Sequence, residues 1–286
     1  MELGKVFGFY DIHHVHFLST LTTRSILIVV WFFNGFDLMP TFTEMIELPC
    51  LYGYTLSKGR MCRVTLHAFV RKKCALCGAI SDHVELISTS YFGSPDLDGR
   101  PPPLGRWTLD TQIQTCPSCG YCAPDISEKI DGASVVVKSS SYKKQLRDPE
   151  LPELANAFLC FSMIMEKVGN YAKAGLACVH AAWVCDDENN DAGARRCRVK
   201  AVALLRKARQ TGQRFAERVG EEIAMMVDLL RRAGRFEEAL EVCNEGLRKH
   251  LGKVIRKVLI FQKELIREGD TACHRIEEAV KEDYEY

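Results

Sequence analysis

The chain has 286 residues, of which 47% are hydrophobic, and it carries a formal net charge of +1 at pH 7. This length is sufficient for two globular domains, or for one small domain attached to a helical body. The near-neutral charge provides no general attraction to nucleic acid or to anionic lipid, so neither is an expected partner.

Residues 1–60 show neither helix caps nor a clear hydrophobic period. The apolar run Ser25–Phe33 is shorter than the roughly 20 residues that a membrane-spanning helix needs, and it lacks the flanking features of a signal peptide. A marginal membrane anchor and a buried or aggregation-prone strand are alternatives. We favour a non-native or disordered segment, with the native start at Met45 or Met61. Three histidines are interpreted as an incidental cluster and not as a metal site: His13, His14 and His16.

Residues 61–125 are predicted to form a zinc-ribbon domain. A strand over Val64–Val70 runs into the turn Cys-Ala-Leu-Cys-Gly at 74–78, and a matching turn, Cys-Pro-Ser-Cys-Gly, follows at 116–120. Two residues between the cysteines let one tight turn aim both sulfurs at the same ion, and the glycine permits a positive φ. We therefore predict one structural Zn²⁺ per chain. Its ligands are Cys74, Cys77, Cys116 and Cys119.

Other chemistries fit these cysteines less well. Disulfides need an oxidising compartment, and a thioredoxin-like site would use one Cys-x-x-Cys motif instead of two. The run of cysteines at 116, 119 and 122 prompts an iron–sulfur interpretation, but Ile126 stands where the ferredoxin pattern requires another cysteine. Cys122 is expected to be a buried thiol, with a spare ligand or a redox-sensitive neighbour as alternatives. A closed four-cysteine site has no open coordination position, so no catalytic residues are predicted.

The segment between the two turns is expected to contain a strand at His83–Ser90, a rigid turn-rich loop at Phe92–Pro103 and a short strand over Trp107–Gln114. Aspartate and proline are residues that turns require for local reasons, although charged loop residues also build binding sites. The candidates for such a polar site are Asp96, Asp98 and Arg100.

Residues 126–152 are predicted to be a linker with a short helix, and residues 153–286 an all-α domain. The helices are expected at 153–168, 171–185, 192–210, 215–233, 236–249, 254–267 and 271–281. The turn Gly-Asn-Tyr-x-x-Ala at 169–174 matches Gly-Arg-Phe-x-x-Ala at 234–239. Such a turn resembles the one between the helices of a tetratricopeptide repeat (TPR).

The glycine that a TPR carries inside its first helix is absent from both units, so we expect a degraded, TPR-like array. An ordinary antiparallel helix bundle is the alternative. The predicted fold class is therefore α+β, with a small β zinc ribbon followed by an all-α TPR-like helical array.

The order of these features resembles a family of uncharacterised bacterial proteins that share a domain of unknown function. Besides the two cysteine turns, the resemblance rests on Ser94–Asp98, Ala181–Asp187 and Phe261–His274. It covers roughly Met61 to the end of the chain. It implies the ribbon-plus-helices architecture and a cytoplasmic location, and it implies no reaction.

The expected function is that of a zinc-binding, non-catalytic adaptor, whose helical array binds a protein or peptide partner in the cytoplasm. The alternatives are a thiol/zinc redox sensor and nucleic-acid binding through the ribbon, which the near-neutral charge opposes. An enzyme would have to use Asp96, Asp98, Cys273 or His274, but none of the common nucleotide-binding or hydrolase motifs is present. Cys273 and His274 would point about 100° apart on a helix, which suits a nucleophile and its base poorly.

Overall fold

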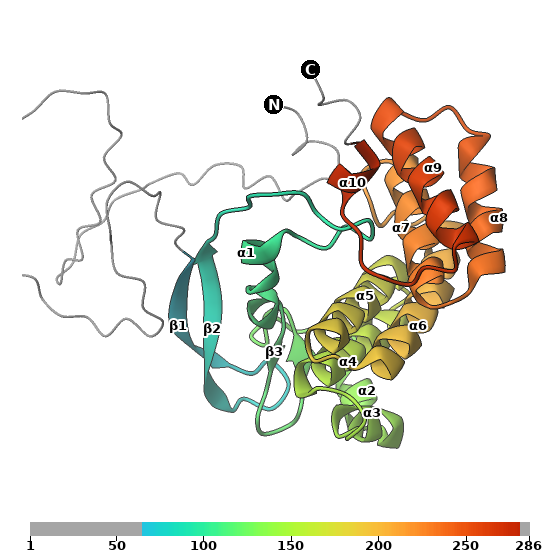
Figure 1. Cartoon of the computed structure of the whole chain (residues 1–286). Coiled ribbons are helices and arrows are strands. Elements are labelled where there is room, and N and C mark those ends of the chain that lie inside the picture. The colour runs from blue at the N-terminus through green and yellow to red at the C-terminus, as the bar shows by residue number, and fades with distance from the viewer. Residues whose placement is uncertain (1–64, 281–286) are drawn as a thin grey trace, which may run out of the picture. The chain divides into compact units, whose positions relative to one another are not determined.

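The computed structural model describes residues 65–280, all of which belong to one compact unit. The expectations for residues 1–60, namely the apolar run, the histidine cluster and the alternative starts, lie outside the described residues. Within the described part, the fold is α+β, as predicted: two small antiparallel sheets are followed by a helical array (Figure 1). None of the helices in residues 65–280 is long and apolar enough to cross a membrane.

The first sheet is the hairpin of β1 (Leu66–Lys73) and β2 (Ile80–Ser88). Both strands were predicted, and the turn between them is the first cysteine turn. Cross-strand pairs such as Phe69 with Val84 set the register. Paired residues share a face of the hairpin, and on this face Phe69 is exposed while Val84 is partly buried.

The predicted strand over Trp107–Gln114 is wrong. Helix α1 (Pro103–Arg106) and the 3-10 helix η2 (Leu109–Gln112) occupy most of this segment. Pro103 has a fixed φ that suits the first position of a helical turn, and the buried Thr108 hydroxyl donates to the carbonyl of Gly105 at 2.8 Å. The extended part is limited to β3 (Gln114–Thr115), which pairs with β4 (Cys122–Ala123).

The segment predicted as a linker contains α2 (Ala133–Lys138) and α3 (Ser140–Leu146), and both pack against the next helix. Helix α3 matches the predicted short helix, and Ser139 caps it by accepting a hydrogen bond from the N–H of Tyr142. Helix α2 was missed because its three consecutive valines favour a strand.

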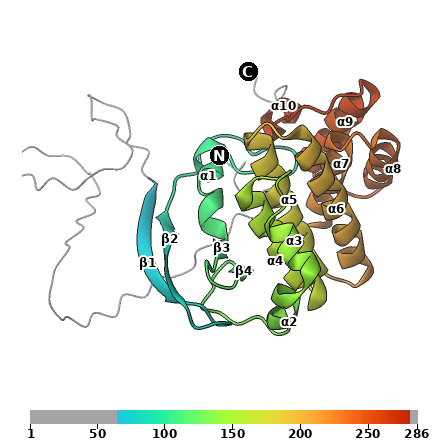
Figure 2. The same ribbon diagram turned by 90° about the horizontal axis from the view of Figure 1, so that it is seen from below.

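The helical array follows in chain order, and each helix packs against the next one (Figures 1 and 2). Its helices are α4 (Glu153–Lys167), α5 (Tyr171–Asp187), α6 (Asp191–Gln210), α7 (Val219–Arg232), α8 (Phe236–Leu247), α9 (Lys253–Arg267) and α10 (Ile276–Val280). Helix α9 also packs against α7. The last helix is shorter than predicted, because residues 270–275 run as an extended segment along its neighbours.

The two turns that match in sequence share one backbone geometry. Gly169 and Gly234 have φ of +78° and +76°, and the N–H of the residue after each donates to the carbonyl five residues back at 2.9 Å. A third copy joins α5 to α6, where Asn189 has φ of 55° and the N–H of Asn190 donates to the carbonyl of Cys185 at 2.8 Å. Asparagine tolerates this conformation, so the third turn has no glycine to mark it.

Candidate metal centre

The two cysteine turns, at 74–79 and 116–121, have the same hydrogen bonds. In each, the N–H of the first cysteine donates to the carbonyl five residues later, at 2.8 and 2.9 Å. The N–H of the glycine donates back to the carbonyl of the first cysteine at 2.9 Å in both turns. Gly78 and Gly120 have φ of +74° and +75°, a conformation that residues with a Cβ rarely adopt. The turn geometry therefore follows from each local sequence.

The sulfur atoms of Cys74, Cys77, Cys116 and Cys119 lie within 4.8 Å of one another. Two close pairs join the two turns, with Cys74 to Cys119 at 3.7 Å and Cys77 to Cys116 at 3.6 Å. A metal ion with four metal–sulfur bonds of about 2.3 Å in a tetrahedron places its sulfurs about 3.8 Å apart. A disulfide would bring two sulfurs to about 2.05 Å, and these cysteines are free thiols. The spacing fits one tetrahedral ion.

The surroundings of the four thiols differ. Cys74 and Cys116 are buried, whereas Cys77 is exposed. A hydrogen bond from the backbone N–H of Ala79 lowers the pKa of Cys77. Burial raises the pKa of Cys116 and of Cys119. Amide N–H groups directed at sulfur are the contacts that stabilise thiolate ligands.

Lys72, two residues before Cys74, binds carboxylates and connects the hairpin to the rest of the unit. The largely buried Lys72 makes ion pairs with Glu85 and with Asp125, the latter at 2.5 Å. The N–H of Ala75 donates to the carbonyl of Ile126 at 2.8 Å. The first turn is thus held against residues that follow the second turn, which fixes how the two pairs of sulfurs face each other.

Cys122 lies outside the four-cysteine group. Its sulfur is 3.4 Å from the Thr115 hydroxyl and 3.4 Å from the Gly120 carbonyl oxygen. It is fully buried, in agreement with the expectation of a buried thiol. The hydroxyl of Tyr142 donates to the same carbonyl at 2.9 Å, which connects the second turn to α3.

The segment between the two cysteine turns is called the insert below. Its candidate polar residues come together with charged residues of the array. Asp98 is completely buried and accepts hydrogen bonds from Trp183 Nε1 at 2.8 Å and from Arg232 Nη1 at 3.3 Å. Burial by itself would raise the pKa of Asp98, but Arg232 and Arg198 outweigh it, and the pKa is lowered. Asp98 is therefore an ionised group enclosed by its partners.

Two further ion pairs involve the same loop, one with helix α5 of the array and one within the insert itself. Arg100 Nη2 lies 2.5 Å from Asp187 Oδ2 on α5, and Arg106 donates to Asp96. Burial, followed by the negative charge of Asp98, raises the pKa of Asp96. Asp98 and Arg100 thus join the insert to helices of the array, whereas Asp96 pairs with Arg106 within the insert and accepts a hydrogen bond from Cys273. We call these contacts the lock between the insert and the array.

The extended segment 270–275 closes over this loop. Arg231 is fully buried and donates to the carbonyl oxygens of Asp270 and Ala272, each at 2.8 Å. On the other side, the N–H of Leu97 donates to the carbonyl of His274 at 2.9 Å. A helical continuation of α10 through these residues would lose both sets of bonds, which explains why the helix begins only at Ile276.

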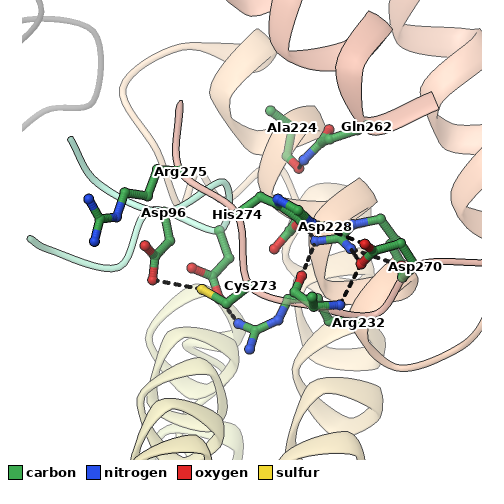
Figure 3. Close-up of polar contacts among 12 residues, drawn as sticks. Asp96, Ala224, Asp228, Arg232, Gln262, Asp270, Cys273, His274 and Arg275 are labelled. Atoms are coloured by element: carbon green, nitrogen blue, oxygen red, sulfur yellow. Dashed lines mark hydrogen bonds and ion pairs between the residues drawn. The ribbon is translucent and has the colours of Figure 1, made fainter. Parts of the chain in front are cut away.

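Cys273 and His274 do not form a nucleophile and its base. The Cys273 thiol donates to Asp96 Oδ2 at 3.1 Å (Figure 3). The residue is exposed, but partial burial of its thiol, together with the negative charges of Asp96 and Asp98, raises the pKa of the thiol to about 12. The ring nitrogens of His274 lie 2.9 Å from Glu278 Oε2 and 3.2 Å from Asp270 Oδ2. The imidazole is therefore engaged by carboxylates, and the thiol is held in its protonated form.

Sequence reasoning missed the array side of the lock, namely Trp183, Arg198 and Arg232. A signal was present in α7, where Asp228, Arg231 and Arg232 interrupt the apolar stretch yet are buried. Charged residues are rarely buried without partners. Their number in one helix pointed to an internal network, although not to the residues that complete it.

The family model for uncharacterised proteins conserved in bacteria (DUF2225) matches residues 108–285. The matched part contains the second cysteine turn and all helices from η2 onward, while Cys74 and Cys77 lie before it. No curated protein and no solved structure matches the chain. Because the family match spans more than half of the residues, the chain belongs to this family.

Proposed function

We propose that this member of the DUF2225 family is a zinc-binding, non-catalytic adaptor. One structural Zn²⁺, bound by Cys74, Cys77, Cys116 and Cys119, holds the insert in place, and a TPR-like helical array binds a protein or peptide partner. The observation that carries the proposal is the set of four sulfurs within 4.8 Å of one another, supplied by two turns of the same geometry. Four thiolates in a tetrahedron favour zinc or iron among the biological metals.

A structural role for the ion is supported by its ligand set. Four protein ligands leave no coordination position for water or substrate. The two close sulfur pairs come from residues 45 and 39 positions apart in the sequence. A metal ion at this point would therefore cross-link two distant turns and restrict the segment between them.

The adaptor role is supported by the construction of the array. Its helices pack in chain order, each against the next, as the units of helical-repeat proteins do, and such arrays present extended binding surfaces. The buried ion pairs of Asp98 and Arg100 hold the insert against this array. A partner would thus meet one pre-organised surface, which lowers the entropic cost of binding.

The test is the metal content of the full chain, measured by elemental analysis. We expect about one zinc per chain in the wild type and none in the double variant Cys116→Ser, Cys119→Ser. Cys273→Ser is the matched control, since it removes a thiol outside the four-cysteine group and should retain its zinc. A folded wild-type protein that holds no zinc after growth in zinc-supplemented medium would disprove the proposal.

A redox sensor is the second candidate, favoured by the exposure of Cys77 in the group. Hydrogen peroxide would accept two electrons from two ligand thiolates, which form a disulfide, while two protons are taken up and two waters leave. Zinc would be released in the same step. Release by stoichiometric peroxide, reversed by a thiol reductant and added zinc, would favour this function, whereas retention of zinc would rule it out.

A further inference from the structure

A cleft of about 550 Å³ lies between the insert and the first helices of the array. One wall comes from α1 and η2, and the other from α4 and α5. The residues that matter for its chemistry are Trp107, Leu109, Asp110, Leu154, Val184 and Glu188. The ion pair of Arg100 with the cleft residue Asp187 joins the two walls, and the cleft residue Arg106 is held within its own wall by Asp96.

The cleft presents an exposed indole beside apolar side chains. Trp107 is 71% exposed, which is unusual for the largest apolar side chain and is typical of binding surfaces. Leu109 and Val184 are buried beneath, and Leu154 is partly buried. Tryptophan is also among the residue types that most often anchor protein–protein interfaces. An apolar group entering here would contact the indole and the leucines together.

The charged side chains of the cleft that are not engaged in ion pairs within the described residues are negative. Of its charged side chains, Arg106 and Asp187 are engaged in ion pairs, with Asp96 and Arg100 respectively. Asp110 and Glu188 are exposed, and within residues 65–280 neither side chain has an ion-pair partner. Their position beside Trp107 combines two features that attract a cation, namely carboxylates and the face of an indole.

We propose that this cleft binds a segment of a protein partner in which arginine or lysine alternates with large aliphatic residues. The cationic head would pair with Asp110 and Glu188, and its aliphatic stem would lie along Trp107. The aliphatic neighbours would cover Leu154 and the indole. Charge complementarity selects this partner over an acidic one. The inference rests on the proposed adaptor function and specifies the chemistry of the partner.

The probe is an acetylated, amidated hexapeptide of alternating leucine and arginine, labelled with a fluorophore and titrated by anisotropy with the full chain. We expect saturable binding that weakens at least tenfold in the double variant Asp110→Asn, Glu188→Gln, and similarly in Trp107→Ala. The matched control is Glu128→Gln, Asp131→Asn, which also removes two exposed carboxylates and should change the affinity less than about twofold.

Two further probes separate binding in the cleft from general attraction to charge. A leucine–glutamate hexapeptide should not bind, and N-acetylarginine amide should bind far more weakly than the arginine peptide. The inference would be overturned if the acidic peptide or the single amino-acid amide bound as tightly as the arginine peptide, or if the cleft variants kept the wild-type affinity. It would also be overturned if the arginine peptide did not bind at the highest concentration of the full chain. Zinc content is measured on the same samples. A wild-type chain that contains zinc but does not bind the arginine peptide rejects only the cleft, whereas a folded wild-type chain without zinc rejects the proposed function.

Discussion

The buried carboxylate of Asp98 is the centre of the charged lock. Its partners Trp183 and Arg232 come from two helices of the array, and all three side chains are buried. Breaking a buried ion pair by removing one partner is strongly destabilising, since the other charge stays buried.

At the residue scale, we therefore predict that Asp98→Ala lowers the free energy of unfolding by about 3–5 kcal/mol. Denaturant unfolding followed by circular dichroism measures it. Asp131→Ala, at an exposed position, should change the same quantity by about 0.5 kcal/mol or less. A loss below about 1 kcal/mol for Asp98→Ala would mean that water or another anion compensates Arg232.

At the scale of elements, the contact between residues 94–97 and 274–277 depends on a titrating group. His274 lies between Asp270, which follows α9, and Glu278 in α10. Burial lowers the pKa of His274, but hydrogen bonds to Glu278 and Asp270 outweigh burial, and the net shift is upward. The protonated ring therefore favours the docked segment.

We predict that this contact weakens as the pH rises. A raised folded-state pKa means that the stabilisation is complete below the ordinary histidine pKa of about 6.5 and is lost as the pH rises through the folded pKa. Hydrogen exchange of the Leu97 and Ile276 amides, expressed as protection factors between about pH 6 and pH 8.5, should show the decrease. His274→Gln should remove the pH dependence, and an unchanged dependence in that variant would assign it to another group.

The packing of α8 between α7 and α9 provides a second test at this scale. A Cβ at Gly246 would lie 2.7 Å from Ile223 Cγ2 and 2.9 Å from Leu259 Cδ1. We expect Gly246→Ala to destabilise the protein by about 1–3 kcal/mol, because overpacking outweighs the gain in helix propensity. Glu245→Ala on the exposed side of the same helix is the control. A stabilised Gly246→Ala variant would show that α8 can shift outward freely.

At the scale of the whole molecule, the candidate metal site and the array would be held by different forces. The array helices contact one another directly, whereas the two cysteine turns would depend on the ion to keep four thiols together. We predict that removing zinc with a chelator exposes residues 66–125 to proteases and leaves most of the helical circular dichroism. Added zinc should restore protection, and added magnesium should not. Simultaneous loss of both signals would show that the ion holds the array as well.

Local features were predictable because a few neighbouring residues decide them. The cysteine turns need only their own glycine and spacing, and the turns at Gly169 and Gly234 need only a residue that accepts positive φ. The same logic failed over Trp107–Gln114, where a short strand was predicted, while a proline start and buried contacts produced α1 and η2.

By itself, the sequence determined the α+β fold class, the four cysteines with ligand spacing and most of the array helices, because turn chemistry and hydrophobic period act over short distances. Only the tertiary structure decided the role of Asp98 as a buried hydrogen-bond and ion-pair partner, since Trp183 and Arg232 lie 85 and 134 residues away in the sequence. It also decided that Cys273 faces Asp96 and that Trp107 stands exposed in a cleft with Asp110 and Glu188. Such pairings depend on how packed helices place distant side chains, and no local pattern records that placement.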